Sequence, residues 1–329
     1  MGPEIRRVSV ELLRHGPRHN QLLSPLTPYL AVCGDFPGGV VHAPYEQAEV
    51  QNLLDDLRYV VASAEPSDRL SVIRDRAGAD IAEMLANVPG LPGVLAGETA
   101  DSGELTHLRI VMSAAELGLL PFELSKIPVG AGSVGDGWLA LQPDRPLCLT
   151  RNVRGVSGSM VPWPIRPRIL YVSGSDVPFE QHLDALERVL EPWRVEGLRR
   201  VDGSDRHWTS PDLTVLREAT MEEIRTLVAE GNFTHVHVLA HGAEIEQRRA
   251  VRYGIALGDR VITGADLALV LSTVAGGARS LPSVVTLASC DSGAQGEVIT
   301  PGGSVAHDLH ASGIPLVVAS QFPISEEAS

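Results

Sequence analysis

Two segments of the chain carry residues that could do covalent chemistry. His241 and Cys290 each end an apolar, β-branched run, over residues 233–241 and 283–290. Small residues flank both. A polar residue at the carboxyl end of a buried strand lies at the mouth of an open α/β sheet. An imidazole at that place can keep a thiol reactive, and this pairing is what nucleophilic acyl transfer requires.

The residues around this pair favour acyl chemistry. A tight turn after Ser289 would expose the thiol and direct the amides of Gly242 and Cys290 at a developing oxyanion. Glycine at position 242 lets a substrate carbonyl approach the main chain closely. His235 and His237 precede His241 in the same run. Only His241 lies at the tip beside a glycine, so we predict that His237 packs or orients rather than acts as the base.

The composition excludes several classes of protein. The chain has 329 residues, 44% of them hydrophobic and 21% charged, as in a well-cored globule. A formal charge of −14 argues against a nucleic-acid partner. No apolar run predicts a membrane span or a secretory signal. Three distant cysteines suggest neither a disulfide framework nor a zinc site. We therefore expect a cytoplasmic protein without a cofactor or metal.

The pattern along the chain predicts an α/β fold. A Pro/Gly-rich connector covers residues 157–167, and strands and helices alternate after it, which indicates crossover connections and a mainly parallel sheet. The predicted strands are Val8–Leu13, Leu105–Met112, Leu147–Asn152, Arg168–Ser173, Leu213–Leu216, 233–241, 283–290 and Ile314–Ala319, with a hairpin around Tyr253–Asp259. The predicted helices are Gln47–Ala64, Leu70–Ala86, Glu180–Trp193, Met221–Ala229, Gly264–Leu271 and Val305–Ala311.

Four blocks of sequence resemble one known family, in order. They are residues 110–124 with the string Leu-Pro-Phe-Glu, residues 237–242 as H-x-x-x-H-G, the cysteine block 287–293, and residues 313–324. Together they resemble the CHAT family of caspase-like cysteine peptidases, relatives of caspases, separases and gingipains. The resemblance implies a caspase-like three-layer α/β/α sandwich with a mainly parallel sheet, plus a mixed N-terminal region. We expect an N-terminal α/β region over residues 1–104 and a CHAT domain over 105–329, truncated at its C-terminus.

The resemblance also implies a mechanism. His241 would be general base and acid, Cys290 the nucleophile, and the amides of Gly242 and Cys290 the oxyanion hole, so that a peptide bond is hydrolysed through a thioester. It implies a specific protein substrate, a regulatory or sensor partner, and a place in bacterial defence or regulated cell death. The residues expected at the substrate pocket are Asp291, Ser320 and Gln321.

The sequence differs from some of these relatives at a position that sets cleavage specificity. Relatives that cut after Arg or Lys often carry an acidic residue two positions before the cysteine. Ala288 occupies that position here, so a preference for a basic residue is not supported, although Asp291 is close by.

Two alternatives remain open from the sequence. Arg14-His15-Gly16-Pro17-Arg18 follows a strand-like run and has the form of the histidine phosphatase nucleophile motif. Asn20 replaces the proline common in the acid phosphatase branch, and that reading leaves the cysteine block unexplained. The other alternative is a caspase-like fold retained as a non-catalytic interaction scaffold.

Overall fold

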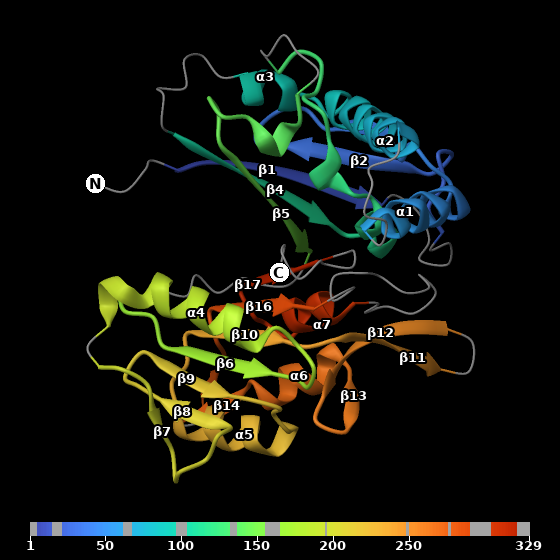
Figure 1. Cartoon of the computed structure of the whole chain (residues 1–329). Coiled ribbons are helices and arrows are strands. Elements are labelled where there is room, and N and C mark those ends of the chain that lie inside the picture. The colour runs from blue at the N-terminus through green and yellow to red at the C-terminus, as the bar shows by residue number, and fades with distance from the viewer. Residues whose placement is uncertain are drawn as a thin grey trace. The chain divides into compact units, whose positions relative to one another are not determined.

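The computed structural model describes residues 5–14, 22–61, 68–96, 104–131, 137–154, 165–194, 196–247, 250–275, 278–289 and 304–320 (Figure 1). The chain divides into two compact units, Met1–Gly155 and Val156–Ser329. The division falls beside the Pro/Gly-rich connector of residues 157–167. The boundary expected between residues 104 and 105 concerns the extent of the family domain and stays a prediction.

The N-terminal unit contains a five-stranded mixed sheet. Its strand order is β3-β2-β1-β4-β5, with β1, β4 and β5 parallel and the β1–β2 and β2–β3 pairs antiparallel. The strands are β1 (Ile5–Arg14), β2 (Pro28–Cys33), β3 (Gly39–His42), β4 (Leu105–Met112) and β5 (Leu147–Val153). The helices are α1 (Gln47–Val61), α2 (Asp68–Ala86) and α3 (Leu91–Ala96), with short 3₁₀ turns at Ala115–Leu119, Phe122–Leu124 and Leu139–Leu141.

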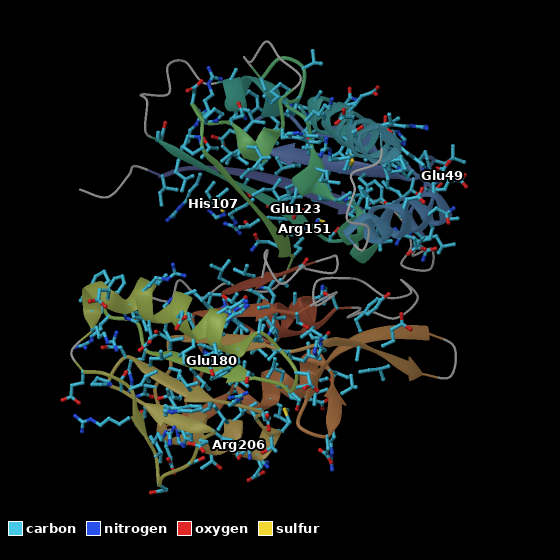
Figure 2. The ribbon with its side chains drawn as sticks, in the orientation of Figure 1. Glu49, His107, Glu123, Arg151, Glu180 and Arg206 are labelled. Atoms are coloured by element: carbon cyan, nitrogen blue, oxygen red, sulfur yellow. The ribbon has the colours of Figure 1, made fainter. Side chains whose placement is uncertain are left out.

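The Leu-Pro-Phe-Glu block is a buried corner of this unit. Phe122 is fully buried, and Arg151 on β5 forms an ion pair with Glu123, its Nε lying 2.8 Å from Oε1 (Figure 2). Burial by itself would raise the pKa of Glu123, but the Arg151 guanidinium outweighs it and lowers that pKa. The α2 backbone passes very close, because a Cβ on Gly78 would lie 2.5 Å from the Leu124 carbonyl oxygen. The block therefore ties β5 and α2 together.

The C-terminal unit contains a seven-stranded, mainly parallel sheet. Its order is β17-β16-β10-β6-β9-β8-β7, and only β8 runs opposite to the other strands, so the β9–β8 and β8–β7 pairs are antiparallel. The strands are β6 (Ile169–Ser173), β7 (Arg199–Arg200), β8 (His207–Thr209), β9 (Leu213–Leu216), β10 (His235–Leu239), β16 (Val284–Ala288) and β17 (Leu316–Ala319). A separate sheet, ordered β11-β12-β13, comprises β11 (Gly242–Gln247), β12 (Ala250–Leu257) and β13 (Arg260–Ile262), and β14 (Thr273–Ala275) pairs with β15 (Ala278–Ser280).

Helices cover both faces of the seven-stranded sheet, which gives three layers. The helices are α4 (Phe179–Leu190, continued by a 3₁₀ turn at Glu191–Trp193), α5 (Met221–Glu230), α6 (Gly264–Val270) and α7 (Val305–Ala311). On β6, Ile169 and Tyr171 face α4, whereas Leu170 and Val172 face the core shared with α5, α6 and α7. This alternation follows from the two-residue period of a strand. The predicted α/β/α sandwich with a mixed N-terminal region is confirmed.

Candidate active site

The candidate site lies at the carboxyl ends of the central parallel strands. Strands β10 and β16 are neighbours, paired in parallel from His235↔Val284 to Leu239↔Ala288. The pairing continues one step further, since the Ala240 amide donates to the Ala288 carbonyl at 3.3 Å. His241 is the next residue after Ala240, and its exposed imidazole stands beyond the end of β10. The strand tip was predicted as the position of His241, and the structure confirms it.

The other predicted site residues divide between described and undescribed parts of the chain. Gly242 begins β11, and Ser320 follows the last residue of β17 and is half-buried. Cys290 follows Ser289, the last described residue of its segment, so Cys290 and Asp291 lie outside the described residues, as does Gln321.

The imidazole of His241 is held by a main-chain carbonyl. Its Nε2 lies 2.9 Å from the carbonyl oxygen of Asp176, in the loop between β6 and α4. A carbonyl can only accept, so Nε2 is the protonated nitrogen, and Nδ1 of the neutral ring keeps its lone pair. Asp176 has a positive φ of 55°, an unusual conformation for a residue other than glycine. The β6–α4 loop thus takes a left-handed backbone conformation at the residue whose carbonyl contacts His241.

Close packing constrains the same loop. The Gly174 amide donates to the Leu239 carbonyl at 2.8 Å, and a Cβ on Gly174 would lie 2.8 Å from the Ala256 carbonyl oxygen. Only glycine therefore lets the end of β6, the end of β10 and the β12 strand meet here. The Ala256 amide in turn donates to the His241 carbonyl at 2.9 Å. The main chain of His241 is thus tied to β12 and its ring to the β6–α4 loop.

Two histidines contact each other beneath α4. Nδ1 of His182 on α4 is 3.0 Å from Nε2 of His237 on β10, and Tyr171 packs against the His237 ring at 5.4 Å between centroids. Burial, and then the neighbouring His182, lower the pKa of His237 to about 4. Burial likewise lowers the pKa of His182. His237 is therefore a neutral packing residue, as predicted, and its partner His182 was not predicted.

The loops that follow β6 and β9 carry charged groups at this edge of the sheet. Glu180 lies in the first turn of α4 (Figure 2), and its carboxylate is 3.8 Å from the Arg217 guanidinium. Arg217 also stands over the Phe179 ring at 5.1 Å. Arg206 donates from Nε to the Arg217 carbonyl at 3.1 Å, which holds the loop after β9. Among the described residues, no three His, Cys, Asp or Glu side chains are grouped as a metal site would require.

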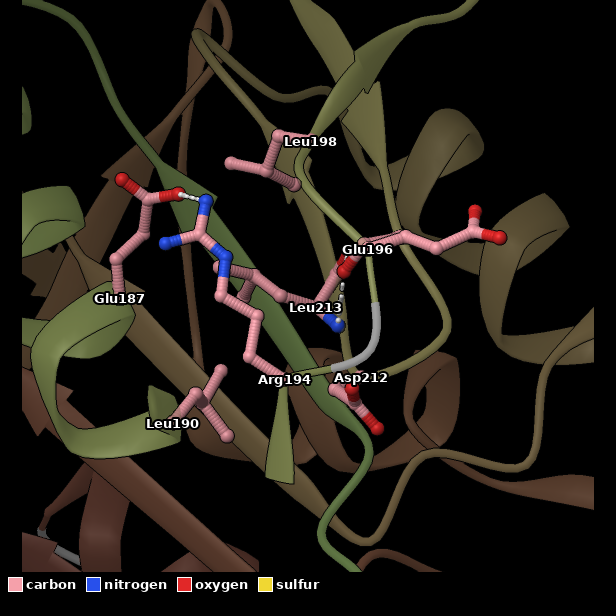
Figure 3. Close-up of a pocket in the computed structure, with 8 residues that line it drawn as sticks. Glu187, Leu190, Arg194, Glu196, Leu198, Asp212 and Leu213 are labelled. Carbon is pink, nitrogen blue, oxygen red and sulfur yellow. Dashed lines mark hydrogen bonds and ion pairs between the residues drawn. The ribbon is translucent and has the colours of Figure 1, made fainter. Parts of the chain in front are cut away.

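The pocket drawn in Figure 3 lies at the opposite edge of the sheet. It is a small hollow between the end of α4 and the start of β9, with a cavity volume of about 10 Å³, and Leu190, Leu198 and Leu213 line it. The Arg194 guanidinium at its rim pairs with Glu187 at 3.0 Å. Since β9 starts at this edge and the site lies where strands end, the pocket contains none of the predicted site residues.

The phosphatase motif contributes one described residue. Arg14 ends β1, and its guanidinium lies 3.2 Å from the carboxylate of Glu116, which is almost fully buried. Tyr29 donates its hydroxyl to the same carboxylate at 3.2 Å. Arg14 therefore has a structural partner in the N-terminal unit. Residues 15–18 of the motif lie outside the described residues.

The comparison with protein families identifies one domain over most of the chain. The family model of the CHAT domain matches residues 75–329, which is well over half of the chain. The chain belongs to the CHAT family. The four sequence blocks that resemble this family therefore belong to a caspase-like domain. The family is one of cysteine peptidases. The CHAT match takes in parts of both compact units.

Two further comparisons found nothing: neither a curated protein nor a solved structure matches this CHAT chain. Among its described helices, none combines the length and the apolar character needed to cross a membrane. One element of the site escaped sequence reasoning. The Asp176 carbonyl had no sequence signal, because every residue carries a carbonyl and only the fold determines which one meets His241.

Proposed function

We propose that this CHAT protein is a cysteine endopeptidase that uses His241 and Cys290 to cleave a specific protein partner. The observation that carries the proposal is the parallel register of β10 and β16, together with the His241–Asp176 hydrogen bond. Both candidate residues follow the paired strand ends at the same distance along the chain. Adjacent strands lie about 4.8 Å apart, a spacing that suits an imidazole and a thiol in one site.

The chemistry follows from the tautomer of His241. With Nε2–H donating to Asp176, Nδ1 is free to accept the proton of the Cys290 thiol. The thiolate attacks the scissile carbonyl carbon, and the resulting oxyanion accepts hydrogen bonds from the amides of Gly242 and Cys290. Collapse breaks the C–N bond, and the protonated imidazole donates its proton to the departing amine. Water, deprotonated by His241, then hydrolyses the thioester and regenerates the thiol.

The orientation of the Gly242 amide supports its role in the oxyanion hole. His241 and Ala256 form a hydrogen-bonded pair of the hairpin, since the Ala256 amide donates to the His241 carbonyl. The alternation of antiparallel pairs then makes Gly242↔Ile255 a non-hydrogen-bonded pair. The amide of Gly242 therefore points away from β12 and is not used by that ladder.

The biological setting extends the same proposal. A cytoplasmic peptidase of this family would act on a protein substrate under the control of a regulatory or sensor protein, in bacterial defence or regulated cell death. Asp291, Ser320 and Gln321 are the residues proposed to border the substrate pocket, because they follow β16 and β17 on the side of Cys290 away from His241.

The test is site-directed labelling combined with cleavage. Iodoacetamide should alkylate Cys290 at neutral pH, His241→Gln should slow that reaction, and Cys290→Ala should abolish cleavage without altering the circular dichroism spectrum. Cys148→Ala is the matched control, since Cys148 is an exposed cysteine of the other unit. Alkylation at Cys148 with an inert Cys290 would refute the proposal, and partner binding without cleavage would favour the scaffold alternative.

A further inference from the structure

The strand that begins next to His241 has a free edge. The order β11-β12-β13 places β11 at the border of its sheet, and within the described part of the chain no strand pairs with its other side. This strand starts at Gly242, so its first amide is the one proposed for the oxyanion hole. The free edge is therefore continuous with the candidate active site.

The hairpin register defines which main-chain groups face that edge. Gly242↔Ile255 and Glu244↔Tyr253 are both non-hydrogen-bonded pairs, because pairs alternate from the bonded pair His241 and Ala256. The N–H and C=O groups of Gly242 and Glu244 thus point away from β12, toward the free edge. Ala243, between them, directs its own groups to the ladder.

The β11–β12 hairpin is closely packed against β13. A Cβ on Gly254 would lie 2.6 Å from the Ile262 carbonyl oxygen and 2.7 Å from Cδ1 of Ile245, so β11, β12 and β13 pack closely at this point. The start of the hairpin is tied to the larger sheet through His241 and Gly174, as described above. Glu244, on this edge strand, is an exposed residue.

The direction of a bound substrate follows from the proposed chemistry. His241 donates a proton to the departing amine, so the part of the substrate after the scissile bond lies on the His241 side of Cys290. The strand order β17-β16-β10 puts that side over β10, away from Ser320. Strand β11 begins there.

We propose that the substrate segment following the scissile bond adds to β11 as a parallel strand. The partner is an extended, unstructured stretch of polypeptide recognised through its main chain, a known mode of peptide binding. The inference rests on the proposed peptidase function.

The parallel hydrogen-bond pattern makes the pairing specific. When the scissile carbonyl accepts from the Gly242 amide, the amide of the second residue after the bond donates to the Gly242 carbonyl. The carbonyl of that second residue accepts from the Glu244 amide, and the amide of the fourth residue donates to the Glu244 carbonyl. The amide of the third residue points away and makes no contact with β11.

The first experiment uses peptides. A cleavable sequence is selected from a proteome-derived peptide library with the wild-type protein, and it is then synthesised with single N-methyl groups after the scissile bond. N-methylation at the second or fourth residue should lower kcat/KM about fivefold each, the effect of one lost hydrogen bond. N-methylation at the third residue should change it little. Equal effects at all three positions would overturn the proposal.

The second experiment changes the protein. Glu244→Pro removes an amide that the β11–β12 ladder does not use, and proline is tolerated on edge strands where its nitrogen faces outward. It should lower kcat/KM about fivefold for the long peptide but not for a fluorogenic substrate with no residue after the scissile bond. Glu244→Ala, which keeps the amide, is the matched control and should behave as wild type.

The outcomes separate this inference from the function on which it rests. Loss of kcat/KM for both substrates in Glu244→Pro, or for neither, would overturn the edge-strand pairing while leaving the peptidase intact. Cleavage that survives Cys290→Ala, or no cleavage of any peptide in the library, would overturn the peptidase function and the pairing with it.

Discussion

The histidine pair between α4 and β10 predicts how the stability of the C-terminal unit depends on pH. His237 has a pKa near 4 in the folded chain, against an ordinary value of 6.5, because it is buried beside His182. The difference corresponds to about 3 kcal/mol, since each pKa unit is worth about 1.4 kcal/mol.

The sign of the effect follows from proton binding. Below pH 6.5 the unfolded chain takes up a proton at His237, whereas the folded chain resists it until the pH approaches 4. The folded state is thus fully stabilised above pH 6.5 and loses stability as the pH falls toward 4. From about pH 7 to about pH 4.5, we expect His237 alone to remove about 2 kcal/mol from the free energy of unfolding.

The assay is urea unfolding at a series of pH values. Tryptophan fluorescence is a suitable signal, because Trp208 packs against Phe179 at the start of α4 with 5.9 Å between ring centroids. The variant His237→Gln can still hydrogen-bond to His182 but does not titrate, so its unfolding free energy should vary less over this range by about 2 kcal/mol. His42→Gln, at an exposed position of the other unit, is the control.

Two results would refute this reasoning. One is an unfolding free energy whose pH dependence is the same in His237→Gln and in the wild type. The other is an NMR titration in which the His237 ring protonates at its ordinary pKa, which would mean that burial beneath α4 does not hold it neutral.

Two further predictions concern packing. Glu116→Ala should lower the unfolding free energy of the N-terminal unit by about 3 kcal/mol, because it leaves Arg14 and the buried Tyr29 hydroxyl without their shared carboxylate; thermal unfolding measures it, and an unchanged Tm would contradict it. Gly264→Ala should cost about 2 kcal/mol, because its Cβ would lie 2.6 Å from the Val305 carbonyl oxygen where α6 meets α7; urea unfolding checks it, and a neutral result would show that the two helices separate easily.

Local patterns were sufficient for most elements of the sheet. Strands Leu105–Met112 and Leu213–Leu216 and the helix Val305–Ala311 have the predicted bounds. Each is a short apolar or amphipathic segment bounded by turn residues, so its periodicity is visible in the chain itself. Strands β2 and β3 are absent from the predicted strands, because Gly34, Pro37, Gly38 and Gly39 are residue types that favour a loop. The alternating burial of Tyr29, Ala31 and Cys33 against the core outweighs that signal.

The sequence by itself determined the fold class, the family resemblance and the place of His241 at a strand tip, since all three depend on residue types and spacing along the chain. Only the tertiary structure decided that the Asp176 carbonyl accepts a hydrogen bond from Nε2–H of His241, that His182 shares a buried contact with His237, and that β11 presents a free edge beside Gly242. These features join residues that are distant in the chain. Their meeting depends on strand order and register, which the sequence pattern does not specify.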